Sequence, residues 1–436
     1  MVHTLPKQLA RLTNHYLRMN LYLFNDNDSA AVFGIGTYIN ELTSTLAGTG
    51  INMHIVHLHS TRLKFEIEKT NQIEHWYFPE VRNQNTFAGN IEMLEAYCRN
   101  IVYLFRIYIK DTKDLIFHFN FNQYQLLAKA LKTVFECKTV MTVHFSNRLL
   151  ALGSNHSLFN IIKSKPENQR NAFEKLLIKT DEYERMLYHQ TDHIIALCKY
   201  MQNLLQSEYQ IESDKISVIQ NGLSIIDTGG RKSYNKEILR KKWHFHKKEN
   251  LILFAGRLQP VKGILYLIRA FRKVIKEIPD CRLLIAGSGE FNYYLNECED
   301  IWTYITWTGL LDKCALNELY SIADIGIMPS FHEQCSFVAI EMMKHGLPII
   351  GSTTTGLKEM ILDGETGLHI PVIESKDKTE IDATLLAEKI LFLLNNPIER
   401  ERMGQNARRN YKNLYNKDLF QNKMLSLYDS LLKMKP

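Results

Sequence analysis

The first pattern that could take part in chemistry is a pair of basic residues on a glycine-flanked segment. Residues 254–263 read FAGRLQPVKG, with Gly256 directly before Arg257 and with Lys262 five positions further on. We expect this segment to connect a strand to a helix, so that the planar guanidinium of Arg257 and the compact charge of Lys262 converge on one diphosphate. The P-loop pattern G-x-x-x-x-G-K-[ST] is absent. The alternative is that both residues are solvated surface charges.

Two glutamates eight positions apart form the second pattern. Glu333 and Glu341 lie in the segment 329–341, PSFHEQCSFVAIE, the first in a loop after a strand and the second in the helix that follows. Ser336 is the expected N-cap of that helix. Carboxylates accept hydrogen bonds from hydroxyl groups, and a helix amino end offers backbone N–H groups to phosphate oxygens. We therefore expect sugar hydroxyls at the glutamates and phosphate oxygens at the backbone of Cys335, Ser336, Phe337 and Val338.

Glycines and acidic residues also follow the first predicted strand. Gly34 and Gly36, in FGIGTY, either let the backbone approach an anion or form a tight turn without a ligand. Isoleucine replaces the third glycine of a dinucleotide fingerprint, and the second strand ends without an acidic residue, which disfavours a nicotinamide dehydrogenase. The triplet Asp26-Asn27-Asp28 resembles a metal-binding D-x-D clip, although these residue types favour turns in any sequence.

Composition sets the broad class of protein. The chain has 436 residues, 45% hydrophobic and 23% charged, which is ordinary for a globular protein and long enough for two hydrophobic cores. Its net charge of +6 is mild and comes without the basic block that nucleic-acid binding usually needs. Seven scattered cysteines without a C-x-x-C pair disfavour disulfides and structural zinc and indicate the reducing cytosol. With no secretory signal or membrane-spanning run, we expect a soluble protein or one attached to a membrane face.

Short apolar runs alternate with helical patterns along the chain. The runs are largely unbroken, as expected for strands buried on both faces of a parallel sheet. The first series is 21–24, 51–57, 115–119, 139–144 and 194–197, and the second is 251–255, 282–286, 305–308, 325–328 and 348–351. The polar stretch 223–250 separates them. The sequence therefore predicts two doubly wound α/β domains, residues 1–225 with a returning helix at 416–436, and residues 226–415.

The second half resembles the nucleotide-sugar domain of retaining glycosyltransferases of family 4, which have the GT-B fold. The resemblance extends over residues 250–372 and rests on FAGRLQPVKG, LLIAGSGE, WTGLL and the stretch from ADIGIMPSFHEQCSFVAIEMMKHG to ETGLHI, which contains the family's E-x7-E element. The first half is similar more loosely, through GIGTY, DLIFHFN, MTVHF and KISVIQNGL. The resemblance implies two Rossmann-like domains that face a cleft, with the C-terminal helix returning to the first.

The resemblance also implies roles for particular residues. Arg257 and Lys262 would hold the diphosphate of the donor. Glu333 would contact hydroxyls of the transferred sugar, and Glu341 those of the ribose. His144, at the end of MTVHF, would point to the donor sugar from the first domain. The remaining donor contacts would come from Gly34, Gly36, Gly256, Cys335, Ser336, Phe337 and Val338.

The chain departs from the family pattern near these residues. Gln334 and Ser336 stand where glycine is frequent, and Phe145 stands where aspartate is frequent. The departures concern loop geometry and acceptor contacts, whereas the expected diphosphate clamp is unchanged. His118 is more simply explained as a core residue than as a catalytic one. The stretch 147–190 is expected to be a loop and a helix on the acceptor side, or a basic amphipathic segment for a membrane surface.

The function that the resemblance implies is retaining transfer of a sugar from a nucleoside-diphosphate sugar, most commonly a UDP-sugar. The acceptor would be a glycan, a lipid-linked saccharide, or a peptide or protein. Front-face attack would let the leaving phosphate take the acceptor proton, so no general base, metal ion or other cofactor is expected. The alternatives are a non-catalytic nucleotide-sugar-binding or chaperone subunit of a transferase pair, and a phosphorylase or epimerase of the same fold. We expect the cytoplasm as the location, with or without peripheral membrane contact, and no nucleic-acid partner.

Overall fold

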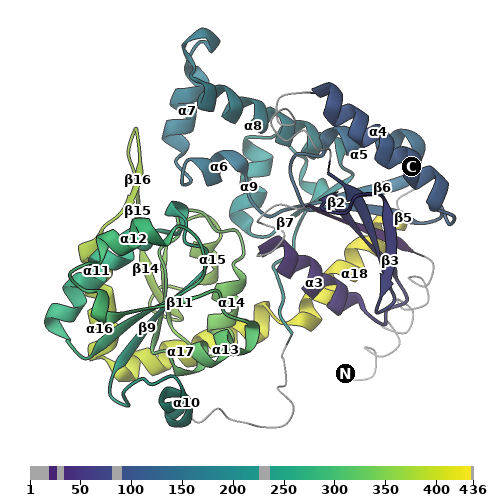
Figure 1. Cartoon of the computed structure of the whole chain (residues 1–436). Helices are drawn as coiled ribbons and strands as arrows, with labels where there is room; N and C mark the ends of the chain where they lie inside the picture. The colour runs from purple at the N-terminus through teal and green to yellow at the C-terminus, as the bar shows by residue number, and fades with distance from the viewer. Residues whose placement is uncertain (1–18, 27–33, 81–90, 225–235, 434–436) are drawn as a thin grey trace. The chain divides into compact units, whose positions relative to one another are not determined.

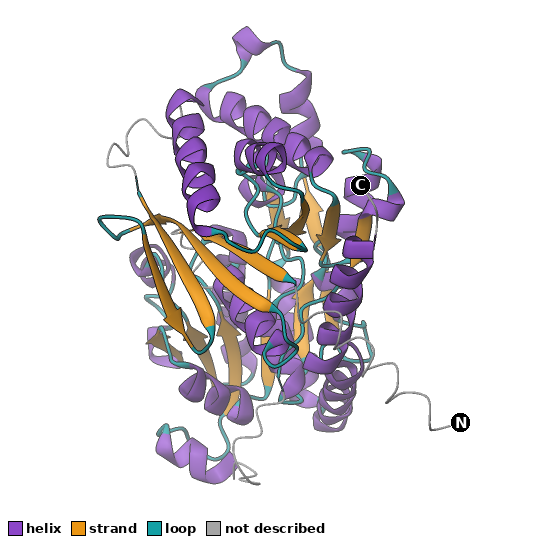
Figure 2. Cartoon of the chain, turned by 90° about the vertical axis from the view of Figure 1, so that its right-hand side faces the viewer, coloured by secondary structure: helices purple, strands orange, loops and turns teal. Residues whose placement is uncertain are grey.

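The computed structural model describes residues 19–26, 34–80, 91–224 and 236–433, which fall into two compact units (Figure 1). Unit 1 consists of the described residues up to Ser146, of Leu176–Gln220 and of those from Lys417 onward. Unit 2 consists of Asn147–Lys175 and of the described residues within Asn221–Asn416. Each unit contains a mainly parallel sheet with helices packed beside it (Figure 2). The predicted fold class, two parallel-sheet α/β domains, is confirmed.

Among the described residues, the sheet of unit 1 has eight strands in the order β3-β4-β2-β1-β5-β6-β7-β8. They are β1 Asn20–Asp26, β2 Asn52–Ser60, β3 Glu66–Thr70, β4 Ile73–Pro79, β5 Leu115–Phe119, β6 Cys137–Val143, β7 His193–Ala196 and β8 Ile216–Val218. Neighbours are parallel except in the β3–β4 hairpin. The unit's helices include α3 Gly34–Leu46, α4 Ile91–Tyr108, α5 Gln125–Val134, α9 Lys199–Ser207 and α18 Lys417–Lys433, and α8 Ala172–Gln190 enters it from unit 2.

The sheet described for unit 2 has six parallel strands in the order β11-β10-β9-β12-β13-β14. They are β9 Asn250–Ala255, β10 Cys281–Ala286, β11 Ile305–Gly309, β12 Ile325–Met328, β13 Ile349–Ser352 and β14 Gly367–Ile370. Because β9 lies between β10 and β12, the strand order reverses there, and sheets of this kind bind ligands beyond the carboxyl ends of the strands around that point. The main helices are α10 Lys236–Lys242, α11 Ile264–Glu277, α13 Lys313–Ile322, α14 Phe337–Lys344, α16 Ala383–Asn395 and α17 Pro397–Leu414.

The ten predicted strands all correspond to strands of the structure, with ends that differ by at most three residues. The strands that sequence analysis missed lack a long apolar run. Strand β3, EIEKT, is an edge strand with four exposed residues, and charges of this kind protect a sheet edge from pairing with other chains. Strands β15 Val372–Glu374 and β16 Thr379–Ile381 are three residues each and form a separate antiparallel hairpin.

Helix α18 belongs to unit 1, as predicted for the returning C-terminal helix. At its start, Lys417 Nζ donates a hydrogen bond to the backbone carbonyl of Ser44, near the end of α3, at 3.0 Å. Further along, the hydroxyl of Tyr428 lies 2.7 Å from Nδ1 of His118, which is completely buried on β5. The helix is thus joined to the central strand of this sheet by a buried hydrogen bond.

Both ring nitrogens of His118 have partners in the core of unit 1. Nε2 lies 2.7 Å from Oγ1 of Thr142, and that hydroxyl lies 3.1 Å from the hydroxyl of Tyr38 on α3. Burial lowers the pKa of His118 to about 3, so the ring is neutral at neutral pH. The core role that the sequence favours for this histidine agrees with its contacts.

The segment 147–175 packs in unit 2, although its sequence position placed it in the predicted first domain. It contains α6 Asn147–Ala151 and α7 His156–Ser164, and hydrogen bonds join it to the β15–β16 hairpin. Nδ2 of the buried Asn155 donates to the carbonyls of Ser375 and Lys378 at 2.8 and 3.0 Å, while its Oδ1 caps α7. The boundary predicted at 225 and 226 lies outside the described residues.

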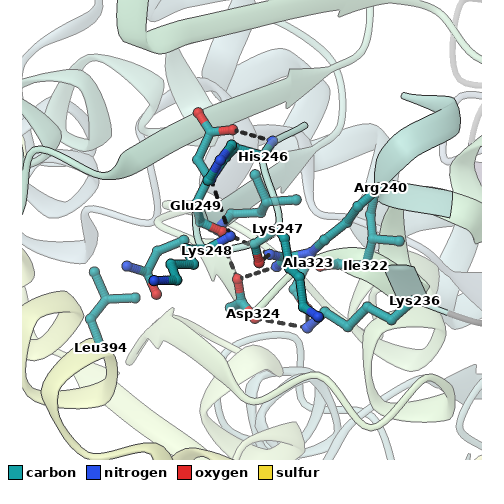
Figure 3. Close-up of polar contacts among 12 residues, drawn as sticks. Lys236, Arg240, His246, Lys247, Lys248, Glu249, Ile322, Ala323, Asp324 and Leu394 are labelled. Carbon is teal, nitrogen blue, oxygen red and sulfur yellow. Dashed lines mark hydrogen bonds and ion pairs between the residues drawn. The ribbon is translucent and has the colours of Figure 1, made fainter. Parts of the chain in front are cut away.

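An ion-pair network around Asp324, whose side chain is 10% exposed, holds the amino-terminal ends of β9 and β12 (Figure 3). Asp324 accepts hydrogen bonds from Arg240 and Lys236 of α10 at 2.7 and 2.8 Å and from the backbone N–H of Leu251 at 2.8 Å. Burial alone would raise the pKa of Asp324, but the charges of Lys236 and Arg240 bring it below its ordinary value. The network stabilises the edge of the sheet opposite to the carboxyl ends of these strands.

The turn between β9 and α11 depends on a glycine. Gly263 has a φ of +67° and lies so close to the next loop that an added Cβ would be 2.0 Å from the carbonyl oxygen of Pro329. The adjacent backbone is joined as well, because the N–H of Phe331 donates to the carbonyl of Val261 at 2.7 Å. The loops after β9 and β12 are therefore in direct backbone contact.

We expect His118→Gln to flatten the dependence of stability on pH. Between pH 6.5 and about 3 the unfolded chain binds a proton that folded His118 does not, so the free energy of unfolding falls as the pH is lowered through this range. At pH 5 the proton uptake costs about 2 kcal/mol. Chemical denaturation at pH 7.5 and pH 5 measures the difference. The exposed His246, changed to Gln, is the control, and an unchanged slope in His118→Gln would contradict the prediction.

We expect Gly263→Ala to lower the free energy of unfolding by more than about 2 kcal/mol, because the new methyl group meets a backbone carbonyl in addition to the strain of a positive φ. Gly364→Ala is the matched control in the same unit. Gly364 has a φ of +72° with open space around its Cβ position, so only the conformational cost of about 1 kcal/mol remains. Equal losses for both variants in urea unfolding would show that the contact with Pro329 is unimportant.

Candidate functional site

Lys262 and Glu333, predicted from separate motifs, are in direct contact. Lys262 ends a single 3-10 turn, Pro260–Lys262, after β9, and Glu333 lies in the loop after β12. Nζ of Lys262 is 2.5 Å from Oε1 of Glu333, and Oγ of Ser330 donates to the same oxygen at 3.1 Å. The two charged side chains are only 18% and 13% exposed. The structure therefore places a cation and a carboxylate together at the carboxyl edge of this sheet.

Hydroxyl groups at and after the end of β13 hold the backbone of the Glu333 loop. Oγ of Ser352 donates to the carbonyl of Ser330, and Oγ1 of Thr354 donates to the carbonyl of Phe331 at 2.6 Å. All these donors are buried. Because buried hydroxyl–carbonyl bonds are costly to leave unmade, they fix the course of the loop. Sequence analysis missed these residues, and the signal for them was the run STTT directly after a predicted strand.

Thr355 fixes the backbone of Glu333 through both its N–H and its carbonyl. Its Oγ1 accepts from the N–H of Glu333 at 3.0 Å and donates to the carbonyl of the same residue. The N–H of Gly356 donates to that carbonyl as well, at 2.8 Å. Thr355 has a φ of +34°, which is uncommon for a β-branched residue. The backbone of Glu333, which carries the carboxylate, is thus held by three hydrogen bonds from one turn.

Asn221 holds the next part of the loop. Its Nδ2 donates to the carbonyl of Cys335 at 2.6 Å, and its backbone N–H lies 3.4 Å from the sulfur of Cys335, with both residues buried. Ser336 then caps α14, accepting from the N–H of Ala339 at 3.4 Å, so the predicted N-cap is confirmed. Phe337 and the half-buried Val338 are in the first turn of this helix. Asn221 belongs to the phrase KISVIQNGL, which gave no hint of this contact.

Glu341 is paired with a different residue from Glu333. It lies on α14, and Oε2 accepts a hydrogen bond from the hydroxyl of Tyr320, on α13, at 2.9 Å. Burial, and then the negative charge of Glu341, raise the pKa of Tyr320 well above its usual value, so the phenol stays protonated and remains a donor. No contact described in the structure joins Glu341 to Lys262.

Arg257 lies on a loop whose backbone packs tightly against its neighbour. Gly256 has a φ of +148°, and its carbonyl oxygen would be 1.8 Å from a Cβ on Gly287, which follows β10. The N–H of Leu258 donates to the carbonyl of Ser288 at 2.8 Å in the same contact. Glycines are therefore needed here for close packing of two loops. The half-buried side chain of Arg257 projects from this fixed turn.

His144 lies in unit 1, at the end of β6. Its Nε2 is 3.1 Å from Oδ1 of Asn120, and its ring makes an edge contact with that of Tyr38, with ring centroids 4.6 Å apart. Burial, and then the proximity of His118, lower the pKa of His144 to about 3. The half-buried ring is therefore a neutral hydrogen-bonding group at neutral pH. Gly34 is exposed and Gly36 half-buried in the first turn of α3.

Asp26 interacts with side chains of unit 1. Oδ1 is 2.9 Å from Nδ1 of His59, and Oδ2 accepts from Nε2 of Gln123 at 2.9 Å and from the hydroxyl of Tyr124. These donors connect the carboxyl ends of β1 and β2 with the segment after β5. The other two residues of the D-x-D triplet, at positions 27 and 28, lie outside the described residues.

No group of three or more His, Cys, Asp or Glu side chains in the described ranges is arranged to hold a metal ion. None of the helices in this part of the chain is both long enough and apolar enough to cross a membrane.

The chain is similar to known proteins over nearly its whole length. Residues 32–225 match the family model Glycosyltransferase Family 4, and residues 235–410 match Glycosyl transferases group 1. An uncharacterized glycosyltransferase of Methanocaldococcus jannaschii is 31% identical over 191 residues, which are 43% of this chain and 49% of that protein. The chain thus spans about half the length of this curated relative.

Solved structures share the fold. Sucrose-phosphate synthase from Thermosynechococcus elongatus has a TM-score of 0.72 at 20% identity, with 95% of this chain and 99% of that chain covered. HepE of Anabaena in complex with UDP-glucose has a TM-score of 0.67 at 13% identity, with 94% and 100% covered. The adjacent family matches and the two parallel-sheet units agree with each other: the chain belongs to glycosyltransferase family 4 and has the GT-B fold.

Proposed function

We propose that the protein is a retaining glycosyltransferase that moves a sugar from a nucleoside-diphosphate sugar to a hydroxyl-bearing acceptor. The observation that carries the proposal is the contact of Lys262 with Glu333 at the carboxyl edge of the unit 2 sheet. A cation for diphosphate and a carboxylate for sugar hydroxyls are the two groups that such a donor requires. UDP is the nucleotide we favour, and the HepE structure, which holds UDP-glucose, supports a donor of this class.

In the proposed reaction the bond between the sugar and the diphosphate breaks through an oxocarbenium-like state. Negative charge then increases on the departing diphosphate, where Arg257, Lys262 and the backbone N–H groups at the start of α14 would stabilise it. Front-face attack lets the leaving phosphate take the acceptor proton, so the proposal needs no general base. Fixed cationic side chains would neutralise the diphosphate without a metal ion. His144, neutral at neutral pH, would accept or donate one hydrogen bond at the sugar.

The proposal gives the acceptor and the location of the protein as broad classes. We propose a glycan, a lipid-linked saccharide, or a peptide or protein as the acceptor, and the cytoplasm or its membrane face as the location. Product formed from the donor alone would instead indicate an epimerase. A requirement for inorganic phosphate would indicate a phosphorylase, and binding without turnover across a broad acceptor panel would indicate a non-catalytic subunit.

We expect UDP to raise the melting temperature more than GDP or ADP, with EDTA present. A ligand that binds only the folded chain stabilises it by about 2.7 kcal/mol at one hundred times its Kd. Differential scanning fluorimetry with the three nucleotides, and then with their sugar conjugates, measures the effect. A shift with GDP or ADP alone would change the donor class, and no shift with any of the three would count against the nucleotide-sugar proposal.

We expect Lys262→Ala to lower kcat/KM for sugar transfer by about 10²- to 10³-fold, because one fixed positive charge on the leaving group is lost. Transfer of radiolabelled sugar from UDP-glucose in EDTA, followed by chromatography, gives the rate. Lys276→Ala, at an exposed position on α11, is the control and should react at the wild-type rate. Near-normal turnover by Lys262→Ala would refute the proposed role of Lys262. If the wild-type protein were inactive in EDTA and active only after a divalent metal is added, metal independence would be refuted.

A further inference from the structure

The ion pair between Lys262 and Glu333 sets a condition on any anion that binds to Lys262. Nζ and Oε1 are 2.5 Å apart, and both side chains are largely shielded from water. A phosphate oxygen that approaches the ammonium must share it with the carboxylate. Two anions around one cation repel each other, and the repulsion is larger where water is partly excluded.

Glu333 has little freedom to move away from an incoming phosphate. Thr355 bonds both its N–H and its carbonyl, and the N–H of Gly356 bonds the carbonyl again. Ser330 donates to the carboxylate oxygen that contacts Lys262, at 3.1 Å. The backbone is fixed, and Ser330 and Lys262 both contact the carboxylate oxygen, so the negative charge is held close to the ammonium.

The residue next to Glu333 supplies no second positive charge. Nδ1 of the buried His332 lies 3.0 Å from Oγ of Ser154. Burial, followed by the positive charge of Lys262 and the proximity of His156, lowers the pKa of His332 to about 3. The imidazole is therefore neutral at neutral pH and cannot compensate a phosphate beside the carboxylate.

Hydroxyl groups of a ligand can compensate the negative charge of Glu333. A carboxylate that accepts hydrogen bonds from hydroxyls keeps its charge favourably in a partly buried place. A nucleoside diphosphate that carries a sugar brings such hydroxyls next to its distal phosphate, whereas the free nucleotide brings a terminal phosphate with further negative charge and no sugar hydroxyl at that place. The same carboxylate therefore stabilises one ligand and destabilises the other.

We propose that Glu333 is a specificity-determining residue that makes the site discriminate against its own product. Its charge weakens binding of the free nucleoside diphosphate and is compensated only when sugar hydroxyls are present. Once the sugar has left, the diphosphate and Glu333 compete for Lys262, and this competition favours release of the nucleotide. The inference rests on the proposed function of the site.

Isothermal titration of Glu333→Gln with UDP and with UDP-glucose tests the inference, with GDP and GDP-mannose as the pair if the thermal screen selects guanosine. Glutamine keeps the shape and removes the charge. We expect UDP to bind up to about tenfold more tightly to the variant than to the wild type, since about 1.4 kcal/mol of repulsion corresponds to tenfold in Kd. UDP-glucose is expected to bind no more tightly than to the wild type.

Two further variants separate charge from shape. Glu333→Asp keeps the charge and should retain the weak binding of UDP, whereas Glu333→Ala removes it and replaces the Gln variant if that protein does not melt cooperatively. Glu380→Gln is the matched control, because Glu380 pairs with Lys378 at 2.9 Å on the exposed hairpin of the same unit, and it should change neither Kd. Unchanged or weaker UDP binding to Glu333→Gln overturns this inference alone. No nucleotide binding to the wild-type chain overturns the proposed function with it.

Discussion

The contact between the ammonium of Lys262 and the carboxylate of Glu333 depends on how three loops meet at one edge of a sheet. The loops follow β9, β12 and β13, which are neighbours in the sheet although long helical segments separate them in sequence. Gly263 allows the first two loops to touch, and Thr355 joins the second to the third. Parallel strands end at the same edge, so this topology brings distant loops together without any local sequence pattern. The ion pair is the chemical result of that arrangement.

Much of the fold could be predicted because parallel strands buried on both faces leave an unambiguous apolar signal. Strand β5, LIFHF, is an example: it is buried along its length and even its histidine is in the core. The β3–β4 and β15–β16 hairpins could not be found in this way. Strand β3 is charged and exposed, and β15 and β16 have three residues each, so these strands depend on pairing with a neighbour that lies outside a local sequence window.

The residues of the candidate site also divide into those that the sequence predicts and those that it does not. Lys262 and Glu333 were predicted because each lies in a segment, FAGRLQPVKG or PSFHEQCSFVAIE, that places charged residues between a strand and a helix. Asn221 was missed because an amide that bonds a backbone 114 positions away leaves no periodic or local trace. Thr355 was missed because the run STTT after a strand does not indicate which backbone its hydroxyls bond. The family resemblance connected the two charged residues to one ligand. Their mutual contact could be found only from the fold, because the resemblance assigned them separate parts of the donor.

The packing of residues 147–175 in unit 2 has a consequence for biosynthesis. Asn155 finds one of its backbone acceptors at Ser375, 220 positions later in the chain. During synthesis, α6 and α7 are therefore complete long before the hairpin that they contact. Until the hairpin is made, the side chains that pack against it remain exposed to water. A fragment that ends between the two halves keeps α6 and α7 without their partner hairpin and lacks α18, and the other fragment lacks α6 and α7.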